Sequence, residues 1–253
     1  MTRLSTGDFD YDAQGGGYAR ERRTDPRIAA LVHAALGPAR TVVNVGAGAG
    51  SYEPADRHVI AIEPSAAMRA QRPADLVPAI HGVAEQLPLD DRSVDAAMAT
   101  LTVHQWGDLE TGLAELVRVT RGPIVVLTFD GEALNRLWLG EYAPELFAVE
   151  RRRYPAIDRI CAGLGGGCAV RPVPIPIDCT DGFSEAFYGR PERFLDPAVR
   201  KSQSAWGFVE PAAEARIVTA LAADLASGAW DASHGHLRTQ PWFNGAVRLI
   251  VRP

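Results

Sequence analysis

The sequence predicts an α/β fold, with a doubly wound and mainly parallel sheet and an inserted, largely helical cap. Four short apolar segments have the composition of strands buried in a parallel sheet, namely 41–45, 58–62, 94–99 and 124–129. Segments 65–72 and 108–120, which lie between them, have helical spacing. This alternation is typical of right-handed crossover units, in which ligands bind at the carboxyl ends of the strands.

The remaining elements complete a single domain. Asp25 and Pro26 open a helix that stops at Gly37. After Gly131 the alternation ends, and two helical stretches and two strands are expected, at 132–150, 211–227, 170–177 and 246–251. Prolines within 170–177 place that strand at a sheet edge. We therefore divide the domain into an N-terminal lid arm, a core, a cap with the returning edge strand and a final strand, at 1–24, 25–130, 131–240 and 241–253.

Composition narrows the class of protein. A chain of 253 residues with 47% hydrophobic content can bury a full core, and its formal charge of -5 offers no general attraction to nucleic acid or to anionic membranes. Cys161, Cys168 and Cys179 lack the paired spacing of a zinc site or a disulfide framework. The first twelve residues carry no apolar signal segment. We expect a cytoplasmic protein that acts on a small molecule, without nucleic acid or membrane partners.

A glycine-rich turn follows the first predicted strand. Gly46, Gly48 and Gly50 would let backbone amides approach a ligand closely, although tight turns of purely structural purpose are common. The next strand ends in Glu63, whose carboxylate can accept both hydroxyls of a ribose. Alternatively, Glu63 only caps the helix that begins near Ser65. A dinucleotide site would favour glycine or alanine at position 51, where this chain has serine.

Three motifs in order, at suitable spacing, resemble the ubiquinone-biosynthesis-like class I methyltransferases, the methyltransferase type 11 family. They are Val43-Asn44-Val45-Gly46-Ala47-Gly48-Ala49-Gly50, Ile62-Glu63-Pro64-Ser65-Ala66-Ala67-Met68, and the segment 82–95 that begins Gly-Val-Ala-Glu. The similarity continues through 100–104 and 115–119, and covers residues 18–130. It implies a seven-stranded sheet and S-adenosylmethionine as cofactor, with S-adenosylhomocysteine as the product.

The resemblance also implies cofactor-binding residues. Gly46, Ala47 and Gly48 would line the methionine portion, and Glu63 would hold the ribose. The adenine would lie against Pro64, Met68, Ala84 and Glu85, and the sulfonium beside Thr100. Tyr18 and Arg22, which resemble part of a Tyr-Ala-Arg-x-Arg arm, would close over the carboxylate.

Two positions depart from the pattern of the family. Asn44 stands where the family usually has an acidic residue, and it keeps acceptor capacity without the charge. Val83 stands where an aspartate is frequent, so recognition of adenine would depend on backbone groups and Glu85. Neither change removes the site.

The acceptor side is less defined by sequence. His104 follows the predicted strand 94–99 and is the candidate catalytic residue, since an ordinary pKa near 6.5 suits a base at neutral pH. A histidine packed beside Trp106 is an equal alternative. Candidate substrate-binding aromatic residues are Tyr11, Trp106, Phe187 and Trp206. His234 and His236 lack an evident third ligand, so no metal site is expected.

Three functions remain open at this point. The first is transfer of the methyl group of S-adenosylmethionine by in-line displacement to an oxygen, nitrogen or carbon nucleophile of a small molecule. The second is noncatalytic binding of S-adenosylmethionine or its product by a regulatory protein. The third is an NAD-dependent oxidoreductase, which shares the strand, the glycine turn and the acidic residue but needs a different third glycine position.

Overall fold

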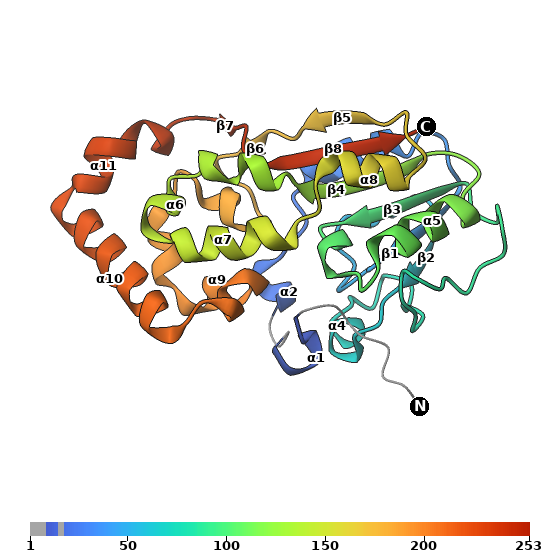
Figure 1. The fold of residues 1–253 in the computed structure, drawn as a ribbon, viewed down its shortest axis with the longest axis horizontal. Helices are drawn as coiled ribbons and strands as arrows, with labels where there is room; N and C mark the ends of the chain where they lie inside the picture. Colours follow the sequence, from blue (N-terminus) through green and yellow to red (C-terminus); the bar gives the residue numbers. More distant parts are fainter. Residues whose placement is uncertain (1–8, 15–17) are drawn as a thin grey trace.

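The computed structural model describes residues 9–14 and 18–253 and contains a six-stranded central sheet, in the order β2-β1-β3-β4-β8-β5 (Figure 1). Its strands are β1 (Thr41–Val45), β2 (His58–Ile62), β3 (Ala96–Thr100), β4 (Ile124–Phe129), β5 (Ala169–Pro172) and β8 (Val247–Arg252). β1 to β4 are mutually parallel, whereas β8 runs antiparallel to both β4 and β5. The predicted doubly wound, mainly parallel α/β class is therefore confirmed.

The sheet has six strands among the described residues, where the resemblance implied seven. On the outer side of β2 a single parallel bridge joins Ile62 to Ile80. Pro73 and Pro78 precede this bridge, and neither can donate a backbone hydrogen bond to a ladder. The segment therefore contacts β2 at one residue without forming a strand.

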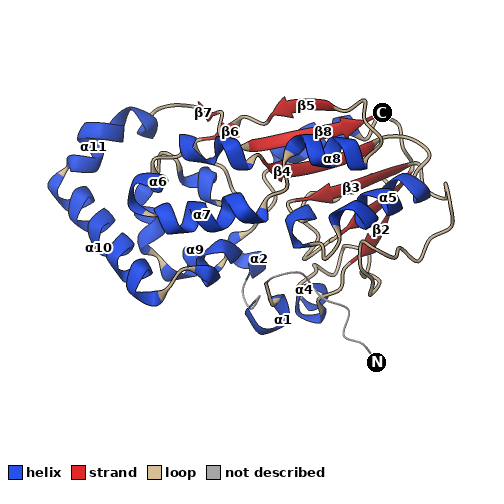
Figure 2. Cartoon of the chain, in the orientation of Figure 1, coloured by secondary structure: helices blue, strands red, loops and turns tan. Residues whose placement is uncertain are grey.

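Helices cover both faces of the sheet (Figure 2). The covering helices are α3 (Pro26–Ala35) on one face, and α5 (Leu109–Val119) and α8 (Ile157–Gly163) on the other. Strand alternation explains this arrangement, because Val42 belongs to the same core cluster as Val32 of α3, whereas its neighbour Val43 belongs to the other cluster, with Leu116 of α5. The Asp25 side chain caps α3 by accepting a hydrogen bond from the amide of Arg27, as the sequence predicted.

A cap of short helices extends beyond one end of the sheet (Figure 1). It contains η2 (Gly131–Arg136), α6 (Leu139–Tyr142), α7 (Pro144–Arg153), η3 (Ser184–Phe187), η4 (Pro191–Leu195), α9 (Pro197–Lys201), η5 (Ser204–Phe208), α10 (Pro211–Ser227), α11 (Ala229–His234), η6 (Gly235–Arg238), β6 (Ile175–Pro176) and β7 (Trp242–Phe243). α10 coincides with the predicted helix 211–227. The predicted helix 132–150 is instead divided, because Ala143 precedes a proline and leaves the helical region, at φ -123° and ψ 56°.

The predicted strand 170–177 is also divided in two. Its first half, β5, lies at the edge of the main sheet, where the proline at 172 was expected to place it. Its second half, β6, pairs with β7 in a separate two-stranded sheet. The predicted strand 246–251 corresponds to β8.

The N-terminal arm lies against the core near the carboxyl end of β2. It contains α1 (Tyr11–Gln14) and α2 (Tyr18–Glu21), and α1 contacts α4 (Ala66–Ala70). Within the predicted lid arm 1–24, residues 1–8 and the three consecutive glycines at 15–17 lie outside the described residues. Arg22, just after α2, forms an isolated antiparallel bridge with Asp181, which joins the arm to the cap.

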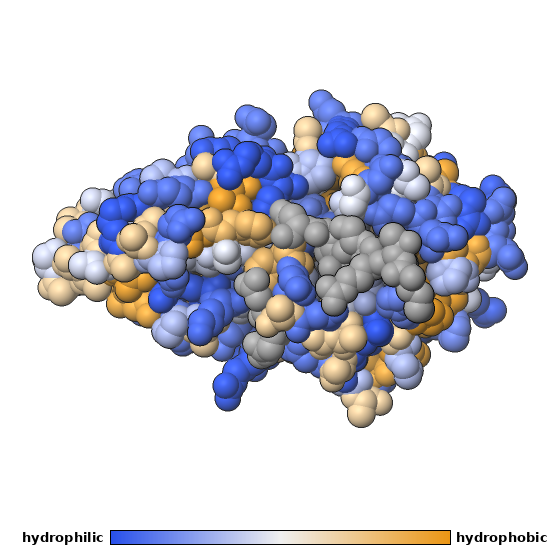
Figure 3. Space-filling model, turned by 60° about the horizontal axis from the view of Figure 1, so that its bottom comes forward, coloured by the Kyte–Doolittle hydropathy of each residue, from blue (hydrophilic) through white to orange (hydrophobic). Residues whose placement is uncertain are grey.

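The face of the molecule drawn in Figure 3 is mainly polar, and its apolar residues lie in small separate groups. No helix within residues 9–14 and 18–253 has the length and apolar character required to cross a membrane.

Candidate functional site

The glycine-rich turn after β1 forms the floor of a cavity of about 840 Å³. The amides of Gly46 and Ala47 both donate to the carbonyl of Ile62, at 2.9 Å each, which holds the turn against the end of β2. Gly46 and Gly48 have φ values of 70° and 52°. A Cβ atom on Gly46 would lie 2.0 Å from Oγ1 of Thr102, so only glycine fits there.

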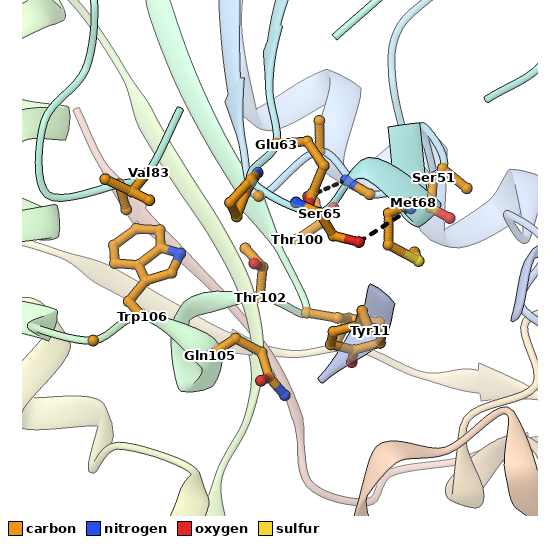
Figure 4. Close-up of a pocket in the computed structure, with 18 of the residues that line it drawn as sticks. Tyr11, Ser51, Glu63, Ser65, Met68, Val83, Thr100, Thr102, Gln105 and Trp106 are labelled. Carbon is orange, nitrogen blue, oxygen red and sulfur yellow. Dashed lines mark hydrogen bonds between the residues drawn. The ribbon is translucent and has the colours of Figure 1, made fainter. Parts of the chain in front are cut away.

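Glu63 lies at the carboxyl end of β2 and faces the same cavity (Figure 4). Its Oε2 accepts from the amide of Gly48 and its Oε1 from the amide of Ser65, both at 2.8 Å. Burial raises the pKa of this carboxyl, although the two amide bonds oppose the rise. Glu63 thus contacts the amide near the helix start, as the capping alternative requires, and a carboxylate retains further lone pairs for a ligand.

The opposite end of the first cavity is formed by residues 83–85 and by the loop that follows β3. Val83, Ala84, Glu85 and Trp106 line it together. Oε1 of Glu85 accepts from the amide of Asp108 at 3.0 Å, which ties the two segments to each other. The Trp106 side chain thus lines this cavity, where we had expected it to line a substrate pocket.

The arm closes one side of the first cavity through α1. Oδ1 of Asp12 accepts hydrogen bonds from Oγ of Ser65 at 2.6 Å and from the amide of Ala67 at 3.0 Å. These bonds fix α1 over the start of α4, and burial raises the pKa of the adjacent phenol of Tyr11. Tyr11 lines the first cavity and also a second one, so it stands at their junction.

Leu101 is the other residue that lines both cavities. It follows Thr100 at the end of β3 and has φ 55°, in the left-handed region that a leucine rarely adopts. Its amide donates to the carbonyl of Leu127 at 2.7 Å, which holds this conformation. Such strained residues concentrate at functional sites.

The second cavity, of about 530 Å³, lies between the sheet and the cap. His104 in η1 (Val103–Gln105) lines it, and its ring centroid lies 4.6 Å from that of Tyr154. Burial holds the pKa of His104 well below 6.5, and the charges of Arg153 and Arg22 lower it further. The imidazole is therefore neutral at neutral pH, and any titration of His104 lies below the near-neutral range expected from its ordinary pKa.

The second cavity is also lined by two carboxyl groups, which the sequence analysis did not identify as site residues. Glu150 comes from α7 and Glu185 from η3, and both are buried. Oε1 of Glu185 accepts from the amide of Ala246 at 2.7 Å. These residues lie in the part of the chain that matched the family only in general character, and no local motif marks them.

Arg22 of the arm occupies a different position from the one expected. Arg22 lines the second cavity, where its Nε donates to Oδ1 of Asp181 at 2.5 Å. The hydroxyl of Tyr52 donates to the other oxygen of Asp181 at 2.7 Å. Arg22 is thus engaged with the cap, away from the glycine turn. Tyr18 lies at the start of α2, and its side chain is outside the described part of the chain.

Asn44 lies beneath the glycine turn and lines neither cavity. Its Nδ2 donates to Oε1 of Glu53 at 2.9 Å, and Arg72 binds both oxygens of the same carboxylate at 3.0 and 2.8 Å. Both partners are almost fully buried. Glu53 therefore supplies a negative charge next to the position where the family usually has one, which the sequence alone did not indicate.

The structure corrects two expected substrate residues, Phe187 and Trp206. Both are buried in the cap core and line neither cavity. The ring of Phe187 packs edge-on against Phe194, with centroids 5.6 Å apart. Neighbours in the same short helical segments, including Ala205, face the second cavity instead, because alternate sides of these segments face the core.

Comparison with known proteins shows the family to which this chain belongs. Residues 43–123 match the family described as a methyltransferase domain. A protein of an antibiotic biosynthesis pathway of Anabaena variabilis, described as a candidate methyltransferase, is 30% identical, with 92% of this chain and 99% of that chain covered and a TM-score of 0.85. The chain belongs to the class I S-adenosylmethionine-dependent methyltransferases.

More distant structures share the fold of this methyltransferase. Phosphoethanolamine N-methyltransferase 2 of Haemonchus contortus is 12% identical, with 96% of this chain and 57% of that chain covered and a TM-score of 0.55. Geranyl diphosphate C-methyltransferase of Streptomyces coelicolor is 14% identical, with 89% and 78% covered and a TM-score of 0.51. No protein with a curated description matches the chain. Since these two neighbours methylate different atoms, the fold leaves the acceptor undecided.

The first cavity fits the cofactor of the methyltransferase family, S-adenosylmethionine. Gly48 has open space on the cavity side, where a Cβ would meet only Cε of Met68, at 3.4 Å. Glu63 offers carboxylate lone pairs at the position suited to a ribose, and Pro64 and Met68 supply apolar surface for a flat base.

Proposed function

We propose that this methyltransferase transfers the methyl group to a nucleophile of a small molecule held in the second cavity. The observation that carries the proposal is the junction of the two cavities, because Tyr11 and Leu101 line both. A cofactor in the first cavity with its reactive end beside Thr100 would then face an acceptor in the second. Two adjoining sites with a shared wall are what in-line transfer requires.

The first cavity would hold the cofactor through groups of three elements. Gly46, Ala47 and Gly48 would carry the methionine portion, Glu63 would accept from the ribose hydroxyls, and Trp106 would lie at the adenine end. We thereby reassign Trp106 from the substrate to the cofactor side. When bound, S-adenosylmethionine supplies a methyl group that is already electrophilic on its sulfonium, so the protein contributes alignment and exclusion of water.

His104 is our candidate for the group that contacts the acceptor and takes its proton. It lines the second cavity, and its neutral imidazole can accept a proton at neutral pH. The packing of its ring against Tyr154 would hold the imidazole in place. The geometry is therefore compatible both with a packing role and with a catalytic role for His104. Kinetic measurements on a His104 variant distinguish the two roles.

A variant that fills the second cavity tests the proposal. Ala205 lines this cavity, so Ala205→Trp should remove methyl transfer to small molecules, measured as release of S-adenosylhomocysteine, while calorimetric affinity for S-adenosylhomocysteine stays within about twofold. Ser204→Trp, at the preceding position, which also lines the cavity, serves if the first variant unfolds. Ala212→Trp, on the exposed start of α10, is the matched control. Full turnover in both cavity variants, with retained fold, would refute the placement of the acceptor.

A further inference from the structure

Glu150 and Glu185 give the second cavity an acidic wall. They are 8% and 1% exposed, and neither forms an ion pair within residues 9–14 and 18–253. Oε1 of Glu185 accepts from the amide of Ala246, whereas its Oε2 is buried without a hydrogen-bond partner in the described structure. Burying a carboxyl oxygen without a partner is unfavourable, so its retention in a cavity points to a ligand that supplies a donor.

The cationic groups around these carboxyls are engaged elsewhere. Arg22 pairs with Asp181, and Arg248 pairs with Asp130 at 3.0 Å. Arg153 donates to Oγ of Ser204 at 3.0 Å, and its guanidinium lies 4.9 Å from the centroid of the Phe208 ring. His104 is neutral at neutral pH. These cationic groups therefore leave both carboxyls without an ion-pair partner among the described residues.

Aromatic rings form much of the remaining wall. Phe129, Phe147, Tyr154 and Phe183 line the cavity. The ring of Phe129 lies 5.1 Å from that of Tyr154 and 5.6 Å from that of Phe183, so the three form a continuous group. Aromatic faces attract cations, most strongly where water is excluded.

We propose that the acceptor is an amine, bound in the second cavity as its ammonium ion between Glu150, Glu185 and the aromatic group. This inference rests on the proposed function and specifies its substrate class. The ammonium would donate hydrogen bonds to the two carboxylates, including the unpartnered Oε2 of Glu185. The aromatic rings would pack against its apolar part.

The protonation of the two carboxyls supports this class of ligand. Burial raises the pKa of Glu185 to about 8, and the charge of Glu150 adds to the rise. The backbone amides of Ala246 and Val247 and the charge of Arg248 oppose it. Burial also raises the pKa of Glu150 to about 7, although Arg153 and Arg22 oppose it. At neutral pH the pair therefore holds protons. A bound ammonium would favour the ionised carboxylates, and the site would release protons to solvent.

Transfer requires a neutral nitrogen. One ammonium proton passes to a ring nitrogen of His104, which lines the same cavity. The amine lone pair then bonds to the methyl carbon while the carbon–sulfur bond breaks, and its electron pair stays on sulfur. The product is an N-methylammonium ion, and His104 later returns its proton to solvent.

Calorimetry on the protein saturated with S-adenosylhomocysteine tests the inference. The probes are benzylamine, phenethylamine and cyclohexylamine, each compared with its matched alcohol and carboxylate. We expect the amines to bind about tenfold or more tightly than the alcohols, with carboxylates weakest. The binding enthalpy of the amines should also vary with the ionisation enthalpy of the buffer at pH 7.5, because protons are released.

Glu150→Gln and Glu185→Gln are the informative variants, since they keep shape and remove charge. Each should weaken amine binding about tenfold and leave alcohol binding unchanged, and Glu185→Gln should reduce proton release. Glu145→Gln, at an exposed position of the same helix as Glu150, is the matched control. Tighter binding of alcohols or carboxylates, equal weakening of all probes, or no binding at millimolar concentration would overturn the inference. Intact S-adenosylhomocysteine affinity and turnover of a neutral acceptor would then leave the proposed function standing, whereas loss of S-adenosylhomocysteine binding to the wild-type protein would contradict both.

Discussion

The first cavity is assembled from strand ends that follow one another in the chain, whereas the second takes its walls from segments spread between Tyr11 and Ala205. Their polar groups differ accordingly. In the first, both oxygens of Glu63 bind amides that lie on adjoining turns. In the second, a buried oxygen of Glu185 has no hydrogen-bond partner within the described residues. A cofactor common to a family can be bound by polar groups that already have hydrogen-bond partners in the protein. A selective acceptor site instead contains polar groups whose hydrogen-bond partner is supplied by the acceptor.

Among the variants proposed for the two cavities, the largest effect should come from replacing a residue of the second cavity. His104→Ala is expected to lower kcat by about a hundredfold to ten-thousandfold while affinity for S-adenosylhomocysteine stays unchanged. Because burial holds the pKa of His104 well below 6.5, the rising limb of the wild-type pH–rate profile should lie below pH 6.5 and vanish in the variant. His58→Ala, at an exposed residue of β2, is the control. Unchanged turnover and an unchanged profile would make His104 a packing residue.

The second largest effect should come from a change in the first cavity that weakens cofactor binding. In Gly46→Ala the new Cβ would meet Thr102 at 2.0 Å, at φ 70°, so affinity for S-adenosylhomocysteine should fall by about a hundredfold. Gly165→Ala is a matched control, because that glycine has φ 89° but a Cβ added there would meet no atom within 4 Å. The affinity of each variant for S-adenosylhomocysteine is measured by calorimetry at a temperature below the thermal midpoints of both variants. Equal losses in both variants would mean that backbone strain alone, and not the close approach, is responsible.

Glu63→Ala should have a smaller effect on the same cavity. Loss of charge-assisted hydrogen bonds to two hydroxyls corresponds to about 1.5 to 3 kcal/mol of binding free energy. Affinity for S-adenosylhomocysteine, measured by calorimetry, should fall accordingly while the fold persists. Glu110→Ala, on the exposed surface of α5, should leave affinity unchanged. A sharp drop in Tm with unchanged affinity would instead identify Glu63 as a structural cap.

The smallest effect concerns stability and sharpens the difference between the carboxyls. The folded-state pKa of Glu185 is raised to about 8, so its proton is bound more tightly in the folded protein than in the unfolded chain. The stabilisation is fully present below pH 4.5 and is lost as the pH rises towards 8. Chemical denaturation across this range should show a shallower slope for Glu185→Gln than for the wild type. Identical slopes would show that Glu185 is ionised in the folded protein.

The two cavities also differ in how far the sequence predicts them. Gly46, Glu63 and Ala84 belong to contiguous motifs, and the order of strands and helices brings such motifs to one sheet edge. Glu150 and Glu185 belong to no motif, because their meeting depends on how cap segments fold back over the sheet. Phe187 and Trp206 illustrate the same difficulty, since a short 3-10 helix leaves open which side faces a cavity and which faces the core. Asn44 was identified, but its partner Glu53 was not, because the bond forms only once the glycine turn has folded.

The position of β8 has a consequence for how the protein acquires its shape. Ala246, just before this strand, donates to Glu185 of the cap and accepts from the amide of Asp130 at the end of β4. Asp130 also pairs with Arg248, 118 residues later in the chain. Contacts of such long separation form slowly, because a large loop must close first. The hydrogen bond from Ala246 to Glu185 can therefore form only after the end of the chain has been synthesised, so the acidic wall is among the last parts of the protein to be completed.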